Sequence, residues 1–188
     1  MITSNDIANQ ALQMIGDNAP QVSGYAPNFD STAPGIALQK LYVPAIQTVG
    51  REFSWDFARN TQPLSLTANT PPFPWKYEYL YPTNCIQIWQ VMPATLADAN
   101  NPLPINWSVG NDEVAGVQTK VVFSNVANAQ AVFNNYPAES LWDPMFREAV
   151  VRLLAAELAI ALEGRPDTSS ALMESGSQME NIAEGRDS

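Results

Sequence analysis

The sequence contains no histidine, and this absence excludes several common kinds of active site. Histidine is the usual general base at neutral pH, the central residue of serine–histidine triads and a frequent zinc ligand. There is a single cysteine, Cys85, so the chain can form neither an intrachain disulfide nor a thiolate cluster around a metal. No glycine-rich stretch ends in the GK[ST] of a phosphate-binding loop. Paired carboxylates remain one candidate for chemistry.

Positive charge is also scarce. Nine Lys and Arg residues oppose 19 Asp and Glu residues, which gives a net charge of −10. The basic residues are scattered singly, and none occurs between Lys76 and Lys120. Sequence-specific DNA binding needs clustered Lys and Arg to neutralise phosphates. This pattern argues against sequence-specific DNA binding, but it allows an acidic protein that lies near DNA without binding it tightly.

Long hydrophobic runs are absent as well. The longest, around Leu153 to Leu162, is interrupted by Glu157 and is shorter than the ~20 residues that span a membrane. Asp6 occupies a position where a signal peptide would carry positive charge. With 46% hydrophobic residues, the chain is apolar enough to fold. We therefore expect a soluble protein made in a reducing cytoplasm.

Helical patterns begin at the N-terminal end. Apolar residues about four apart predict a helix from Thr3 or Ser4 to about Ile15, followed by a loop over residues 17–32. Pro34 then fits the first turn of a second helix, because the N–H that proline lacks would have no partner there.

The second helix has an N-cap at Ser31 or Thr32 and contains Pro44, which should kink it. Two shorter helices are the alternative. An apolar stripe predicts that the helix continues to about Ala58. The residues of this stripe are Ile36, Leu41, Ala45, Val49, Phe53 and Phe57.

A third helix is predicted from Asp143 and Pro144 to Gly164, and a weaker last helix follows from Asp167. The last helix has spaced apolar residues but little core of its own. Such a segment is often completed by a partner, although a frayed, solvated tail is the alternative. Its apolar residues are Leu172, Met173, Met179 and Ile182.

Between the helical regions, the chain has short β-branched or aromatic stretches separated by clusters of Pro, Gly and Asn, which predict four to six antiparallel strands. The predicted fold class is α+β, with N- and C-terminal helices that form a helical bundle and an inserted antiparallel β-sheet module. The predicted bundle comprises residues 1–60 and 142–166, and the module comprises residues 61–141. Residues 167–188 form the C-terminal helix or tail.

Three acidic residues in the predicted module are candidates for chemistry. Two carboxylates can cleave a glycosidic bond, and the candidates are Glu78 or the pair Asp112 and Glu113. The alternative interpretation is structural: Glu78 is the outward residue of a strand, and Asp112–Glu113 is a polar turn. The sequence favours the structural interpretation. The oxygen-ligand spacing of an EF-hand is absent, so a calcium loop of that kind is not predicted.

Aromatic residues are concentrated in the same region. They could form a platform that stacks on sugars or a patch for a protein partner, or they could be part of the β core, since aromatic residues favour strands. The residues are Trp75, Tyr77, Tyr79, Tyr81 and Trp89.

Several stretches resemble a known family when they are taken in order. These are "DIANQALQMIGDNAP", "REFSWDFARNTQPLSL", "YEYLYPTNCIQIWQV" and "FREAVVRLLAAELAIALEGRPDTSSALM". In this order the chain resembles the head-to-tail adaptors (tail tubular protein A, or head completion proteins) of short-tailed phages, the podoviruses. The resemblance covers almost the whole chain and depends on order and spacing rather than on one motif.

The resemblance implies a structural virion protein without enzymatic activity or cofactor. Adaptors of this kind form a dodecameric ring at the head–tail junction. The ring joins the portal protein to the tail nozzle, closes the packaged head, and surrounds the channel through which DNA is ejected. Assembly would take place in the host cytoplasm.

The resemblance also implies two interfaces. The C-terminal segment would bind the portal, and the inserted sheet would face the tail. The expected portal residues are Arg165, Leu172, Met173, Met179, Ile182 and Arg186, and the expected tail residues are Trp75, Tyr77 and Trp107. Packaged DNA would pass along an acidic wall without specific binding. The alternatives kept open are a tail-associated peptidoglycan hydrolase and a carbohydrate-binding module.

Overall fold

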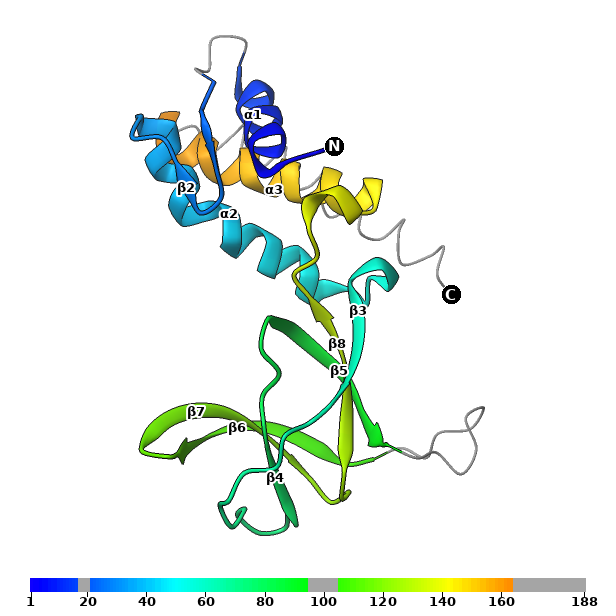
Figure 1. Ribbon diagram of the computed structural model, residues 1–188. Coiled ribbons are helices and arrows are strands. Elements are labelled where there is room, and N and C mark those ends of the chain that lie inside the picture. The colour runs from blue at the N-terminus through cyan, green and yellow to red at the C-terminus, as the bar shows by residue number, and fades with distance from the viewer. Residues whose placement is uncertain (17–20, 95–104, 164–188) are drawn as a thin grey trace. The chain divides into compact units, whose positions relative to one another are not determined.

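The computed structural model describes residues 1–16, 21–94 and 105–163, and the fold is mixed α and β with antiparallel sheets (Figure 1). The chain divides into two compact units. Among the described residues, the helical unit comprises Met1–Phe53 together with residues 137–163, and the β unit lies within Ser54–Tyr136. These boundaries fall a few residues before the predicted ones on both sides of the module.

The first helix, α1, spans Ser4–Ile15 and confirms its prediction. Thr3 is the N-cap in a capping box, in which the Thr3 N–H donates to the Asp6 carboxylate at 2.9 Å and the Asp6 N–H donates to the Thr3 hydroxyl at 3.3 Å. These bonds lower the pKa of Asp6, because the Thr3 hydroxyl and N–H both stabilise the charged carboxylate. The buried face includes Ile7, Ala8, Ala11, Leu12 and Ile15.

A small hairpin lies in the region predicted as loop. Its strands, β1 (Gly24–Tyr25) and β2 (Asn28–Phe29), pair antiparallel. Asp30 follows the hairpin, and its carboxylate accepts hydrogen bonds from the Thr32 hydroxyl and, at 2.7 Å, from the Ser23 N–H. These contacts lower the pKa of Asp30 to about 2. Asp30 thus ties the hairpin to the start of the next helix.

The second helix, α2, spans Ala33–Glu52 with Thr32 as its N-cap, as predicted, and it continues through Pro44 as one helix. The predicted extension to Ala58 is wrong. Phe53 has the extended backbone of a C-cap, and a short 3-10 turn, η1, follows at Asp56–Ala58. The chain leaves the helix here because it enters the β unit, where Trp55 is buried and contacts Phe57 edge to face.

The buried face of α2 also differs from the predicted stripe. Ile36 is 45% exposed, whereas Leu38, Tyr42 and Ile46 are buried. Of the predicted stripe, only Ala45 and Val49 belong to the fully buried face. Ile36 and Leu41 lie in α2 but off this face, whereas Phe53 and Phe57 lie beyond the end of the helix.

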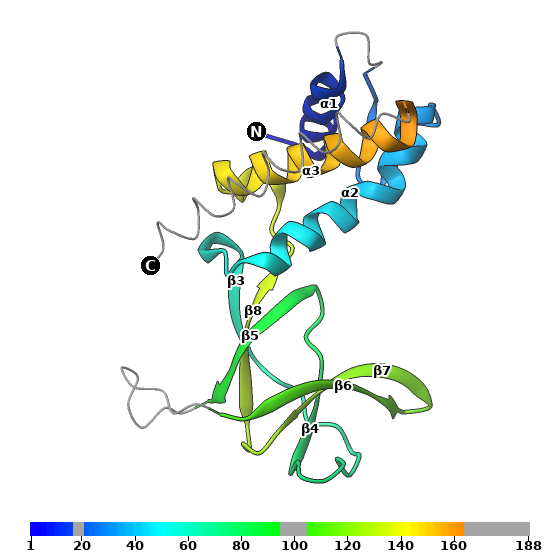
Figure 2. The ribbon, with the colours of Figure 1, turned by 180° about the vertical axis from the view of Figure 1, so that it is seen from behind.

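The third helix, α3, spans Pro144–Glu163 and packs against both α1 and α2, as both views show (Figure 1 and Figure 2). Asp143 precedes it as predicted, and its carboxylate accepts a hydrogen bond from the Met145 N–H at 2.7 Å. A 3-10 turn, η2 (Glu139–Leu141), lies just before, where Glu139 accepts a hydrogen bond from the Tyr42 hydroxyl at 3.2 Å. No helix in the described ranges is long and apolar enough to cross a membrane.

The β unit contains two three-stranded antiparallel sheets, whereas the sequence predicted one. Five of the six strands overlap the β-branched or aromatic stretches from which strands are predicted, and β6 was missed. These stretches are "TQPLSL", "KYEYLYP", "NCIQIWQV", "VQTKVVFSN" and "AQAVFNNYP". The first sheet has the order β3 (Arg59–Pro63), β8 (Ala129–Asn135), β5 (Cys85–Pro93), and the second has the order β4 (Tyr77–Leu80), β7 (Val117–Ser124), β6 (Trp107–Val114).

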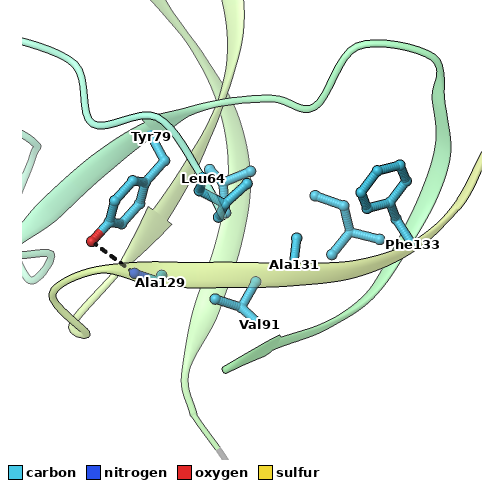
Figure 3. Close-up of a cluster of buried hydrophobic side chains, with 8 residues drawn as sticks. Leu64, Tyr79, Val91, Ala129, Ala131 and Phe133 are labelled. Carbon is cyan, nitrogen blue, oxygen red and sulfur yellow. Dashed lines mark hydrogen bonds between the residues drawn. The ribbon is translucent and has the colours of Figure 1, made fainter. Parts of the chain in front are cut away.

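Side chains from both sheets form one hydrophobic core in the β unit (Figure 3). Its largest fully buried members are Tyr79 and Phe133, each 1% exposed. The Tyr79 hydroxyl donates to the Val126 carbonyl at 2.6 Å and accepts from the Ala129 N–H at 3.5 Å, so this polar group is satisfied inside the core. The core cluster consists of Leu64, Tyr79, Ile88, Val91, Val122, Ala129, Ala131 and Phe133.

Candidate functional site

The predicted interface residues fall in two groups. The predicted portal residues lie outside the described residues; they are Arg165, Leu172, Met173, Met179, Ile182 and Arg186. The predicted tail residues Trp75, Tyr77 and Trp107 all lie in the β unit and are half-buried.

Two of the predicted tail residues contact the core. Tyr77 and Trp107 both pair with Ser124, from opposite sides of β7, so they lie on the same face of the sheet. This face packs against the core cluster, and Tyr77 and Trp107 both contact it. Trp75 lies elsewhere and stacks on Phe123, with ring centroids 6.5 Å apart and planes 18° apart.

The aromatic residues therefore do not form one open platform. Tyr79 is buried in the core, and Tyr77 and Tyr81 pack around it. Trp75 contacts Phe123, which alternates with the core-facing residues of β7 and so belongs to the opposite face of the sheet. In the described part of the chain, these rings mainly serve to pack the β unit.

Glu78 and Asp112, which are far apart in the sequence, are brought together by the sheet. Glu78 on β4 pairs with Phe123, which pairs in turn with Ser108 on β6. Because side chains alternate along a strand, Ser108 and Asp112 share the face that carries Glu78. We call Glu78 and Asp112 the carboxyl pair.

Both structural expectations for these residues are wrong. Glu78 is not an outward strand residue, because it is only 1% exposed. Asp112 and Glu113 are not a turn, because they lie inside β6 and pair with Thr119 and Gln118. Both faces of this sheet are covered by other parts of the β unit. The alternation of residues along the strand therefore could not show that the acidic side chain is buried.

A polar network surrounds the buried carboxyl of Glu78. Its Oε1 accepts hydrogen bonds from the Thr67 hydroxyl at 2.8 Å and from the Asn69 side-chain amide at 3.1 Å. The same Asn69 amide donates to the Glu113 carbonyl at 2.9 Å and lies 3.4 Å from Asp112 Oδ2. Thr67 and Asn69 were not singled out in the sequence, because polar residues near a Pro cluster are typical of any loop.

The side-chain amide of Asn69 contacts both carboxyls, so the two groups lie close enough to influence each other's ionisation. Burial raises the pKa of Glu78 above its ordinary value of 4.5; the Thr67 hydroxyl opposes this effect, and Asp112 adds to it. The Glu113 N–H, which donates to Asp112 at 2.7 Å, lowers the pKa of Asp112, and Glu78 lowers it further. Of the two carboxyls, Glu78 therefore binds a proton more readily, and its Oε2 is buried without a hydrogen-bond partner.

This geometry does not suit glycoside hydrolysis. The two carboxyls of a glycosidase are about 5–9.5 Å apart so that the sugar and water fit between them. Here the Asn69 amide contacts both carboxyls, and Glu78 is almost inaccessible. Among the described residues there is also no group of three or more His, Cys, Asp or Glu side chains that could hold a metal ion.

A shallow pocket is present in the helical unit, between α1 and α3. Its volume is about 410 Å³, and most of its lining is polar. Arg152 near this pocket forms an ion pair with Glu148 at 2.7 Å, one turn earlier on α3. The lining residues are Gln10, Gln13, Met14, Arg147, Glu148 and Val151. This lining has neither the apolar character nor the convergent ionisable groups of a catalytic pocket.

The carboxyl pair is the most distinctive polar arrangement in the described residues, and its geometry suits a structural role in the β unit better than a reaction. Comparison with known proteins adds no family name. No protein-family model matches the chain, and a search of curated proteins finds no match to it.

Proposed function

We propose that this chain is a structural virion protein, the head-to-tail adaptor of a short-tailed phage. The observation that carries the proposal is the order of the two units along the chain. Residues from both ends of the described chain contribute to one helical unit, and the β unit lies between them in sequence. This order supports the resemblance described above, in which a helical bundle carries an inserted antiparallel β-sheet module.

In this proposal the subunits form a dodecameric ring between portal and tail nozzle. The helices supply the scaffold, the C-terminal segment binds the portal, and the β unit faces the tail. A ring strengthens attachment beyond the affinity of one contact. Once one subunit of the ring has bound, the neighbouring subunits are held at a high effective concentration near their own binding sites. The protein would act without catalysis or cofactor.

The charge of the chain agrees with a channel for DNA. Each subunit has a net charge of −10, and no run of basic residues interrupts it. An acidic wall repels phosphates, so DNA can move past it during ejection without being retained.

We expect weak binding of this protein to duplex DNA at moderate salt, because too few Lys and Arg are available to replace the counterions of DNA. A gel-shift titration with random-sequence duplex measures this, with a basic DNA-binding protein as the positive control. A tight complex in the same buffer would contradict the acidic-wall interpretation.

The proposed function is tested by measuring mass with and without a partner. We expect the purified chain to be monomeric or weakly associated, and to form a ring of defined stoichiometry when the portal protein of the same virus is added. Native mass spectrometry and electron microscopy of the mixture report both states. A chain that stays unassociated in the presence of portal and nozzle proteins would refute the proposal.

A further inference from the structure

The segment from Thr67 to Lys76 covers the face of the β4–β7–β6 sheet that carries the carboxyl pair; we call it the 67–76 segment. At its start, the Thr67 N–H donates to the Glu78 carbonyl at 2.9 Å. At its end, the Lys76 N–H donates to Asn125 at 3.0 Å, and Trp75 stacks on Phe123. Between these anchors, Phe73 is 97% exposed. The two ends of the segment are therefore bound to the sheet, while the Phe73 side chain between them is exposed to solvent.

We propose that Glu78 and Asp112 share a single proton, and that this proton holds the 67–76 segment on the sheet, so that its loss at higher pH loosens the segment. The inference concerns the β unit alone and does not depend on the adaptor function.

The first argument is the balance of donors and acceptors. The side-chain amide of Asn69 contacts three acceptors, which are the Glu78 carboxyl, the Asp112 carboxyl and the Glu113 carbonyl. Thr67 supplies one further donor to Glu78. Glu78 Oε2 is buried and accepts no hydrogen bond from these groups. A proton on this oxygen completes the network, because it supplies the missing donor toward Asp112.

The second argument is the balance of charge. Lys120 on β7 places its ammonium over the Tyr81 ring, 3.8 Å from the centroid, and neither it nor Lys76 forms an ion pair with either carboxyl. The strand residues that share the face of the pair include no cation; among them are Leu80 on β4, Thr119, Val121 and Phe123 on β7, and Ser108, Gly110 and Val114 on β6. Two ionised carboxylates would therefore repel each other without a compensating cation, and one of them is buried.

The direction of the pH dependence follows from the two shifts. The pKa of Glu78 is raised, so its contribution to stability is complete below 4.5 and is lost as pH rises through the raised pKa. The pKa of Asp112 is lowered, so its contribution is complete above 3.8 and is lost as pH falls through the lowered pKa. The segment is held best between these two limits. When the pH rises above the raised pKa of Glu78, both carboxyls are ionised. Thr67 and Asn69 then separate from Glu78, so that water can reach its carboxylate.

The test is a carboxyl NMR titration of Glu78 combined with hydrogen-exchange protection of the Thr67 amide, in the whole protein. In the wild type we expect Glu78 to titrate above 4.5, and the protection factor of Thr67 to fall roughly tenfold for each unit by which the pKa is raised. In Asp112→Asn, Glu78 should titrate closer to its ordinary value. In Glu78→Gln, whose amide can replace the shared proton as donor, protection should no longer fall as pH rises.

Glu113→Gln is the matched control, because it removes a neighbouring exposed carboxylate and should retain the wild-type profile. The proposal is overturned if Glu78 titrates at or below its ordinary value, if Asp112→Asn leaves that titration unchanged, or if protection of Thr67 stays constant while Glu78 ionises. Recovery of protection at high pH by millimolar Ca²⁺ would also overturn it, since a cation would then balance the pair. The wild-type and Asp112→Asn titrations decide the question even if Glu78→Gln does not fold.

Discussion

A chain that ends at Arg165 is expected to keep the fold of both units and to lose binding to the portal protein. The described helices and strands all lie before this point, since α3 ends at Glu163. The truncation removes the four apolar residues that the adaptor proposal assigns to the portal. Each of them, when buried, contributes ~1.5–3 kcal/mol before the cost of ordering the segment. Loss of this contribution at every position of a ring should reduce attachment to an undetectable level.

Binding of the truncated chain to portal rings is measured by co-sedimentation, and its fold by circular dichroism and thermal unfolding. A full-length variant in which Leu172, Met173, Met179 and Ile182 are replaced by serine is the matched control, because it keeps the length of the segment and removes only the apolar contacts. Both variants should fail to sediment with the portal. Normal attachment of the truncated chain would show that the portal interface lies elsewhere.

Phe133→Ala is expected to destabilise the β unit by about 3–5 kcal/mol, a large part of the stability of a small domain. Phe133 is 1% exposed and lies on β8, the central strand of its sheet. It pairs with Asn60 on one side and Ile88 on the other. Truncation to alanine removes the ring from the core and leaves a cavity. The backbone of β8 is hydrogen-bonded to a strand on each side, so it cannot shift to fill this cavity.

Phe73→Ala is the matched substitution, because the same change is made in the same unit at a side chain that is 97% exposed. It should change the free energy of unfolding by no more than about 0.5 kcal/mol. Urea unfolding followed by tryptophan fluorescence measures both variants. Equal losses from the two substitutions would mean that the core cluster does not hold the β unit together.

The beginnings of the helices could be predicted from sequence, because their signals are local. Thr3, Thr32 and Asp143 each lie next to the first turn that they cap, so a few neighbouring residues are sufficient to identify them. The strands rich in β-branched and aromatic residues were predicted for a similar reason. β6 was missed because its sequence, "WSVGNDEV", has polar residues that are typical of a turn.

The end of α2 could not be read from periodicity. Phe53 and Phe57 continue the spacing of the helix, but the chain turns into the β unit after Glu52. Burial of Trp55 in that unit competes with one more helical turn, and the tertiary contact prevails because helix propagation alone contributes little per residue.

The amino-acid sequence by itself determined the acidic charge, the absence of histidine chemistry and the places where helices begin, since these depend on composition or on adjacent residues. Only the tertiary structure decided that Glu78 is buried and that Asp112 lies beside it. These residues are far apart in the chain and meet only because β7 lies between their strands. Proton sharing is a property of the distance between two carboxyls, and that distance is set by strand pairing rather than by the residues themselves.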